Sequence, residues 1–175
     1  KELFELSSQQ NNHYAFLGLG NLYGYGLGVE KDIDKASFYY RQSAKQNNLS
    51  AIFNIGLIYY EKYDFINAKE CFERASKQNY SFASMLLGTL YKNGYGVKKD
   101  YSKVKKYYEI AIEQNNLNKS FINSDIYNNL GELYESLEKD FSKAKECYEQ
   151  ASDLGNSNAL IKLGNLYYFG NGVKQ

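Results

Sequence analysis

The chain has 175 residues, with 21 basic and 20 acidic side chains and a formal net charge of +1. This balance gives no electrostatic reason to expect a nucleic acid or an anionic membrane as a partner. No apolar run reaches the roughly 18 residues that a membrane span needs, so we expect no membrane insertion. Cys71 and Cys147 follow the same tripeptide, Ala-Lys-Glu, in two stretches far apart in the sequence. We therefore expect two buried thiols and no disulfide.

A short pattern recurs along the chain. A Leu-Gly or Ile-Gly step stands four residues after an anchor residue, and a tyrosine follows the step. The anchors recur at spacings of 36, 32, 43 and 33 residues, at Ala15, Ala51, Ala83, Ile126 and Ala159. Repetition with a period of about 20–50 residues is typical of a solenoid. We therefore predict an all-α fold in which each repeat is a pair of helices.

In chain order, residues 1–12 are expected to end a preceding repeat, with a helix over about 1–10. The repeats that follow are predicted at 13–48, 49–80, 81–123 and 124–156, and a fifth begins at 157–175. The long spacing places extra residues near 117–125, either as a loop or as further turns of a helix. Because the chain starts inside a predicted helix and stops in a predicted loop, we expect the natural protein to be longer.

Glycine occupies the same helix-interior position in every repeat: Gly20, Gly56, Gly88, Gly131 and Gly164. A glycine inside a helix costs about 1 kcal/mol relative to alanine. Its recurrence predicts a close crossing of two helices, where a Cβ would clash.

Four aspartates each stand four residues before a small residue and are predicted to cap the second helix of a repeat: Asp32, Asp64, Asp100 and Asp140. An aspartate at this position accepts the free N–H groups of the first turn, so we interpret all four as structural caps and not as catalytic acids. The second helices are expected to end at 46–48, 78–79, 114–116 and 154–156, because asparagine and glycine there tolerate a left-handed stop.

Taken together, these motifs resemble the Sel-1-like repeat family, a branch of the tetratricopeptide repeat superfamily. The pattern Ala-x-x-x-Leu-Gly-x-x-Tyr, Gly-x-Gly-Val, Asp-x-x-Lys-Ala is matched over 15–44 and over 83–111, where Val104 replaces the alanine. Residues 159–173 match its first half, whereas the second and fourth repeats have the shorter loop of ordinary tetratricopeptide repeats. The resemblance implies a right-handed α-solenoid superhelix of antiparallel helix pairs that acts as an adaptor or scaffold, with no shared ligand class.

Three sequence matches to chemical sites are better interpreted as structural residues of the repeats. The glycine-rich loop 24–28 joins two predicted helices, whereas a dinucleotide site needs a strand before the loop. Ser142 and Lys145 form a Ser-x-x-Lys match without the other motifs of penicillin-interacting enzymes. His13 is the only histidine, and one histidine does not make a metal site. We therefore expect no catalytic residue, no cofactor and no metal, and we do not expect an enzyme.

The resemblance also implies a concave groove lined by the first helix of each repeat. It places in this groove Asn21, Asn54, Tyr60, Met85, Asn129 and Tyr168. The asparagine amides there either bond an extended peptide backbone or are merely solvated. Leu17, Phe82 and Leu86 fill the basic positions of a known carboxylate-binding groove, so that site is not assembled.

We therefore expect a protein–protein interaction scaffold that binds a protein or peptide segment in the groove. The alternative is a structural or regulatory spacer in a larger assembly, with contacts through its convex face or through further repeats. Self-association through the ends of the array is also open. The sequence assigns neither the partner nor a cellular compartment.

Overall fold

The computed structural model describes residues 1–118 and 124–171, and every regular element in these ranges is a helix. The predicted all-α class is thus confirmed. The chain divides into two compact units, residues 1–99 and 100–175, each described here by itself. The first unit holds α1 (Glu2–Ser8), α2 (His13–Tyr25), α3 (Ile33–Lys45), α4 (Leu49–Glu61), α5 (Phe65–Ser76) and α6 (Ser81–Asn93). The second holds α7 (Tyr101–Asn118), α8 (Ser124–Leu133), the π-helical turn η1 (Tyr134–Glu138), α9 (Phe141–Asp153) and α10 (Ser157–Phe169).

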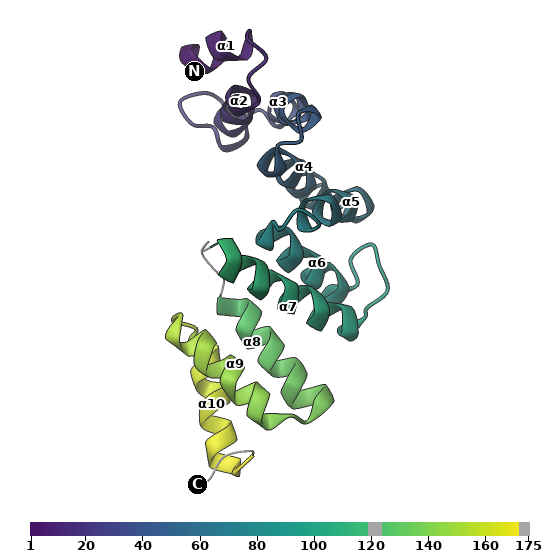
Figure 1. Ribbon diagram of the computed structural model, residues 1–175, viewed down its shortest axis with the longest axis vertical. Coiled ribbons are helices and arrows are strands. Elements are labelled where there is room, and N and C mark those ends of the chain that lie inside the picture. The colour runs from purple at the N-terminus through teal and green to yellow at the C-terminus, as the bar shows by residue number, and fades with distance from the viewer. Residues whose placement is uncertain (119–123, 172–175) are drawn as a thin grey trace. The chain divides into compact units, whose positions relative to one another are not determined.

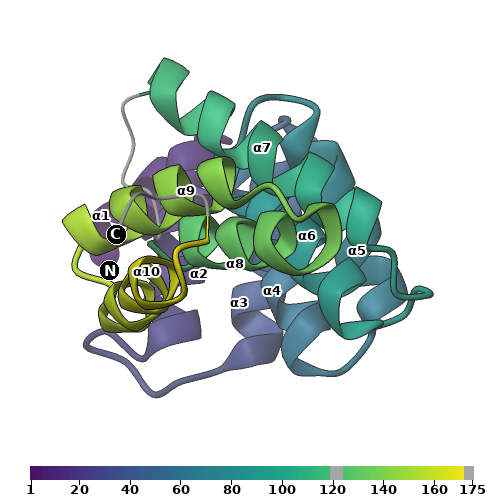
Figure 2. The same ribbon diagram turned by 90° about the horizontal axis from the view of Figure 1, so that it is seen from below.

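Within each unit, consecutive helices pack against one another. In the first unit α2 packs on α3, α3 on α4, and α4 on α5 (Figure 1). In the second unit α9 lies beside both α8 and α10, as the two perpendicular views agree (Figures 1 and 2). The division between the units, after Lys99, falls inside the third predicted repeat. The repeat boundaries themselves stay predictions.

Three of the five repeated glycines, Gly20, Gly56 and Gly131, mark close helix crossings as predicted, whereas a Cβ on Gly164 would meet no atom of the described residues within 4 Å. A Cβ built on Gly20 would meet the ring of Tyr40, one on Gly56 would lie 2.6 Å from Phe72 Cε1, and one on Gly131 would lie 2.6 Å from Tyr148 Cε1. In each case an aromatic ring of the repeat's second helix fills the space above the glycine of its first. Glycine is therefore favoured at this position by packing, which outweighs its cost in helix propensity.

All four aspartates cap a helix, as predicted. Each carboxylate accepts the backbone N–H three residues further on: Asp32 from Lys35 at 2.9 Å, Asp64 from Asn67 at 3.3 Å, Asp100 from Lys103 at 3.1 Å and Asp140 from Lys143 at 3.1 Å. Three of the four predicted helix ends hold as well, because α3, α5 and α9 are followed by left-handed residues, namely Asn47, Asn79 and Gly155, with φ of 63°, 63° and 85°.

The prediction that a helix ends within 114–116 is wrong. The helix α7 continues through these residues to Asn118 and is 18 residues long, five longer than α3 or α9. Gln114 and Asn115 are buried in it, with exposed fractions of 6% and 8%, so packing holds them in the helix. Part of the extra length near 117–125 is therefore helical. Residues 119–123 lie outside the described ranges.

Candidate binding pocket

Two of the residues predicted to line a groove are in direct contact. Asn54 on α4 donates its Nδ2 to Asn21 Oδ1 on α2 at 3.2 Å. The hydroxyl of Tyr40 on α3 donates to the same oxygen at 2.9 Å. One amide oxygen therefore joins the first helices of two consecutive repeats to the helix between them. Burial raises the pKa of Tyr40 to about 12, so its hydroxyl keeps its proton at neutral pH.

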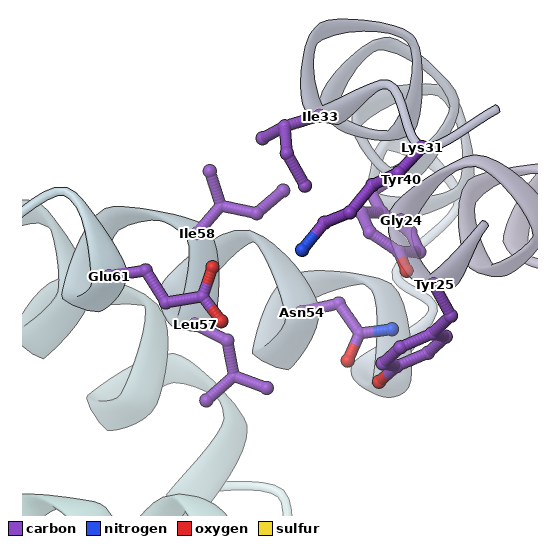
Figure 3. A pocket seen from close by; sticks show the side chains of 9 residues that line it. All are labelled: Gly24, Tyr25, Lys31, Ile33, Tyr40, Asn54, Leu57, Ile58 and Glu61. Atoms are coloured by element: carbon purple, nitrogen blue, oxygen red, sulfur yellow. The ribbon is translucent and has the colours of Figure 1, made fainter.

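An open pocket lies beside this junction, with a volume of about 160 Å³ (Figure 3). The end of α2, the loop 26–32, the start of α3 and one side of α4 form its walls. The residues that line it are Gly24, Tyr25, Lys31, Ile33, Tyr40, Asn54, Leu57, Ile58 and Glu61. A polar edge with Asn54 and the Tyr40 hydroxyl therefore adjoins an aliphatic wall and two charged side chains.

The loop 26–32 is fixed at both ends. Gly26 takes the left-handed conformation that stops α2, with φ 71°. Asp32 donates its backbone N–H to the Tyr23 carbonyl at 2.9 Å and caps α3 with its side chain. Two groups of Lys35 hold the pKa of the Asp32 carboxyl below its ordinary value. The larger effect comes from its backbone N–H, and the smaller from its ammonium, which lies 2.9 Å from the carboxylate. The backbone next to Lys31 is therefore anchored, and its side chain extends into the pocket (Figure 3).

The other predicted groove residues do not line this pocket. Tyr60 belongs to an aromatic cluster, with ring centroids 5.3 Å from Phe65 and 6.2 Å from Tyr95. Met85 is half-buried on α6. Asn129, half-buried on α8, and Tyr168, 78% exposed on α10, belong to the second unit.

Sequence reasoning missed the charged and aliphatic residues that complete the pocket, above all Lys31, Ile33 and Glu61. Helical periodicity predicts which residues share one face of a single helix. It does not report that a loop between two helices lies against the helix of the next repeat. The one local signal was that Lys31 directly precedes the cap Asp32, whose place at the start of α3 was predicted.

The second unit carries a related junction with different chemistry. Glu132 and Lys162, which follow and precede the repeat glycines as Asn21 and Asn54 do, form an ion pair at 3.6 Å. Tyr148 donates its hydroxyl to Glu135 Oε2 at 2.6 Å. A polar pocket of about 570 Å³ lies here, lined by Glu132, Glu135, Ser136, Lys139, Phe141, Lys162 and Asn171. The link between successive first helices is therefore an amide pair in one unit and an ion pair in the other.

The residues weighed for catalysis or metal binding have structural contacts. His13 Nδ1 lies 2.9 Å from Asn48 Nδ2, so the histidine joins the starts of α2 and α4. Lys145 pairs with Glu149 at 3.4 Å on the same helix, while Ser142 is exposed in the first turn of α9. Over the described ranges, no group of three or more His, Cys, Asp or Glu side chains is placed to hold a metal ion.

The prediction of buried cysteines is wrong, because both side chains are only half-buried. Cys71 and Cys147 are both free thiols. Burial raises the pKa of each thiol, that of Cys147 to about 12, so neither is activated as a nucleophile. Within residues 1–118 and 124–171, no helix combines the length and the apolar character that a membrane span needs.

Comparison with known repeats gives a consistent result along the chain. The family model described as Sel1 repeat matches residues 14–48, 81–116 and 157–175. The model described as Tetratricopeptide repeat matches 49–81 and 124–155. The two kinds alternate, as the long and short loops between the paired helices do.

Two solved structures are similar over nearly the whole chain. The protective antigen c5321 of uropathogenic Escherichia coli, which displays an SLR fold, is 28% identical with a TM-score of 0.84. The match covers 99% of this chain and 37% of that protein. A Sel1 repeat protein from Oxalobacter formigenes is 31% identical with a TM-score of 0.78, over 93% of this chain and 66% of the other. These structures confirm the predicted solenoid class.

The curated relatives match over shorter stretches. The ERAD-associated E3 ubiquitin-protein ligase component HRD3 of Candida glabrata is 30% identical over 77 residues, 44% of this chain and 9% of the relative. HRD3A of Arabidopsis thaliana is 38% identical over 53 residues, 30% of this chain and 8% of the relative. A putative sel1-like repeat-containing protein of Acanthamoeba polyphaga mimivirus, L21, is 32% identical over 73 residues, 42% of this chain and 14% of the relative. The matched stretch is therefore a small part of each of these relatives, while the repeat matches cover most of this chain. The chain belongs to the Sel1 repeat family.

Proposed function

We propose that this chain binds a protein segment at the pocket of its first unit. Sel1 and tetratricopeptide repeats generally mediate protein–protein interactions, so a protein partner follows from the family. The HRD3 relatives are by name components of a ligase, which supports a role within an assembly. The proposal goes further, because it names the binding surface on this chain.

The arrangement of Asn54 is the observation that carries the proposal. Its Nδ2 is fixed by Asn21, and its side chain lines the open pocket. Its carbonyl oxygen accepts no hydrogen bond from the described residues. A fixed amide with a free acceptor is suited to a peptide N–H, and an extended segment offers such groups along its length. The aliphatic wall beside it supplies apolar area for a side chain of the same segment.

A capture experiment tests this proposal. The wild-type chain is immobilised and exposed to lysate of the source cell, beside the variant Tyr25→Ala/Lys31→Ala/Glu61→Ala. These three side chains line the pocket and are exposed, so their removal should leave the fold intact. The matched control is Tyr63→Ala/Glu70→Ala/Lys77→Ala, which removes the same three residue types from exposed positions outside the pocket.

We expect a protein that the wild type and the control retain and that the pocket variant loses, with all three melting alike. Such a result would also identify the partner. Equal capture by all three would contradict the proposal and would favour a spacer that uses other surfaces.

A further inference from the structure

The pocket of the first unit is bounded by two opposite charges that do not meet. Lys31 and Glu61 both line it, and both side chains are directed into it from opposite sides (Figure 3). Neither forms an ion pair with any residue in the described ranges. Close by, Lys62, which directly follows α4, forms an ion pair at 3.8 Å with Asp34 in the first turn of α3. The two segments are thus near enough for opposite charges to pair, yet Lys31 and Glu61 remain apart across the pocket.

Aliphatic side chains flank these two charges. They are Ile33 from the start of α3 and Leu57 and Ile58 from α4 (Figure 3). The pocket volume of about 160 Å³ is close to that of an apolar cavity that holds one benzene molecule. The space therefore suits a single apolar side chain.

We propose that the occupant is a peptide segment in which one apolar side chain lies between an acidic and a basic group. This inference rests on the proposed function and adds the chemistry of the ligand. The apolar side chain contacts Ile33, Leu57 and Ile58, the acidic group pairs with Lys31, and the basic group pairs with Glu61.

The electrostatic cost of covering Lys31 and Glu61 favours this ligand over a neutral, a doubly acidic or a doubly basic segment. A neutral apolar segment would cover both charges and take them partly out of water without supplying a partner. A segment with two acidic groups would pair with Lys31 and repel Glu61, and one with two basic groups would do the reverse. A segment with one of each satisfies both ends of the pocket, so specificity comes as much from repulsion of the wrong ligands as from attraction.

Short peptides of defined charge test the inference directly. The probes are N-acetylated and C-amidated, so that their ends carry no charge. The mixed peptide Asp-Ala-Leu-Ala-Lys is used in both chain orders, beside Asp-Ala-Leu-Ala-Asp, Lys-Ala-Leu-Ala-Lys and the neutral Asn-Ala-Leu-Ala-Gln. Binding is followed by NMR through the side-chain amide of Asn54. We expect one order of the mixed peptide to bind the wild type about tenfold more tightly than the other three compositions.

Charge reversal should exchange this preference. The variant Lys31→Glu should bind the doubly basic peptide best, and Glu61→Lys should bind the doubly acidic peptide best. Lys77→Glu, an exposed reversal outside the pocket, should keep the preference of the wild type. Both pocket side chains are exposed, so the variants should fold, which is checked by their melting.

Three outcomes would overturn the inference: equal binding of the neutral and mixed peptides, unchanged preference in both reversed variants, or no shift of Asn54 with any peptide. None of these results decides the proposed function, because partner capture by the alanine variants tests that function separately. Loss of a captured partner with the pocket variant, combined with no charge preference, would leave the binding surface in place and remove only the ligand chemistry.

Discussion

The ring of Phe72 occupies the space that a side chain at Gly56 would need. A Cβ at this glycine would lie 2.6 Å from Phe72 Cε1, and Phe72 is fully buried. The same relation joins Gly131 to Tyr148 in the second unit. The recurring glycine is therefore a packing requirement of each paired crossing.

Gly56→Ala should accordingly destabilise the fold. The clash with Phe72 should cost about 1–3 kcal/mol, more than the roughly 1 kcal/mol that alanine gains over glycine in a helix. Gly164→Ala is the matched control, because no atom of the described residues lies within 4 Å of a Cβ there. That change should be neutral or stabilising by up to about 1 kcal/mol. Urea denaturation measures both, and shifts of the same sign and size would contradict this account of the glycines.

Asn48 should contribute more to stability than Asn12, although both cap a first helix. Asn48 accepts the Ala51 N–H at 3.1 Å and also contacts His13 at the start of α2, and it is buried. Asn12 caps α2 at an exposed position. Loss of a cap costs about 1 kcal/mol, and loss of a buried hydrogen bond adds about as much again. Equal denaturation midpoints for Asn48→Ala and Asn12→Ala would show that the contact of Asn48 with His13 adds nothing to stability.

The helix caps should make stability fall in acid. The backbone N–H and then the ammonium of Lys35 lower the pKa of Asp32, and Lys143 does the same for Asp140. A lowered carboxyl pKa stabilises the fold fully above the unfolded value of about 3.9, and this contribution is lost as the pH falls through the lower folded value. Asp32→Asn/Asp140→Asn keeps side-chain caps but removes their titration. The variant should therefore lose less stability than the wild type between pH 7 and pH 2.5, measured by urea denaturation at each pH. A loss as large as in the wild type would contradict the assignment.

The contact between Tyr40 and Asn21 should appear in a double-mutant cycle. Asn21→Ala would leave the hydroxyl of Tyr40, whose side chain is largely buried, without its 2.9 Å acceptor, at a cost of about 1–3 kcal/mol. In a chain that already carries Tyr40→Phe, the same change should cost much less, because no hydroxyl is left without a partner. Chemical denaturation of the four proteins gives the coupling energy. Additive effects of the two changes would mean that the hydrogen bond contributes nothing to the stability of the junction.

The fold was largely predictable because its signals are local and repeated. The caps at Asp32, Asp64, Asp100 and Asp140 each act within one helical turn, and the glycine pattern identified the crossings. The failure at 114–116 has a tertiary cause. Asparagine is a good stop residue in isolation, but Gln114 and Asn115 are buried and continue the helix. Local preference yields to packing at such positions.

The candidate site was predictable only in part. Superfamily positions led to Asn21 and Asn54, and the structure places them in contact, although their role in binding stays a prediction. The charges of the pocket were not found, because Lys31 and Glu61 lie in different repeats. They line the same pocket because α3 packs on α4, which brings the loop before α3 and the last residue of α4 to one place. Sequence periodicity carries no information on which loop residue meets which residue of the next helix.

Site-specific photo-crosslinking tests the central claim most directly. The photoreactive residue p-benzoylphenylalanine replaces either Tyr25, which lines the pocket and is 64% exposed, or Tyr63, which lies outside it and is 81% exposed. A partner captured by the wild-type chain is then irradiated in complex with each protein. We predict a covalent adduct from position 25 and little or none from position 63. An adduct from position 63 with none from position 25 would place the partner on another surface and contradict the claim.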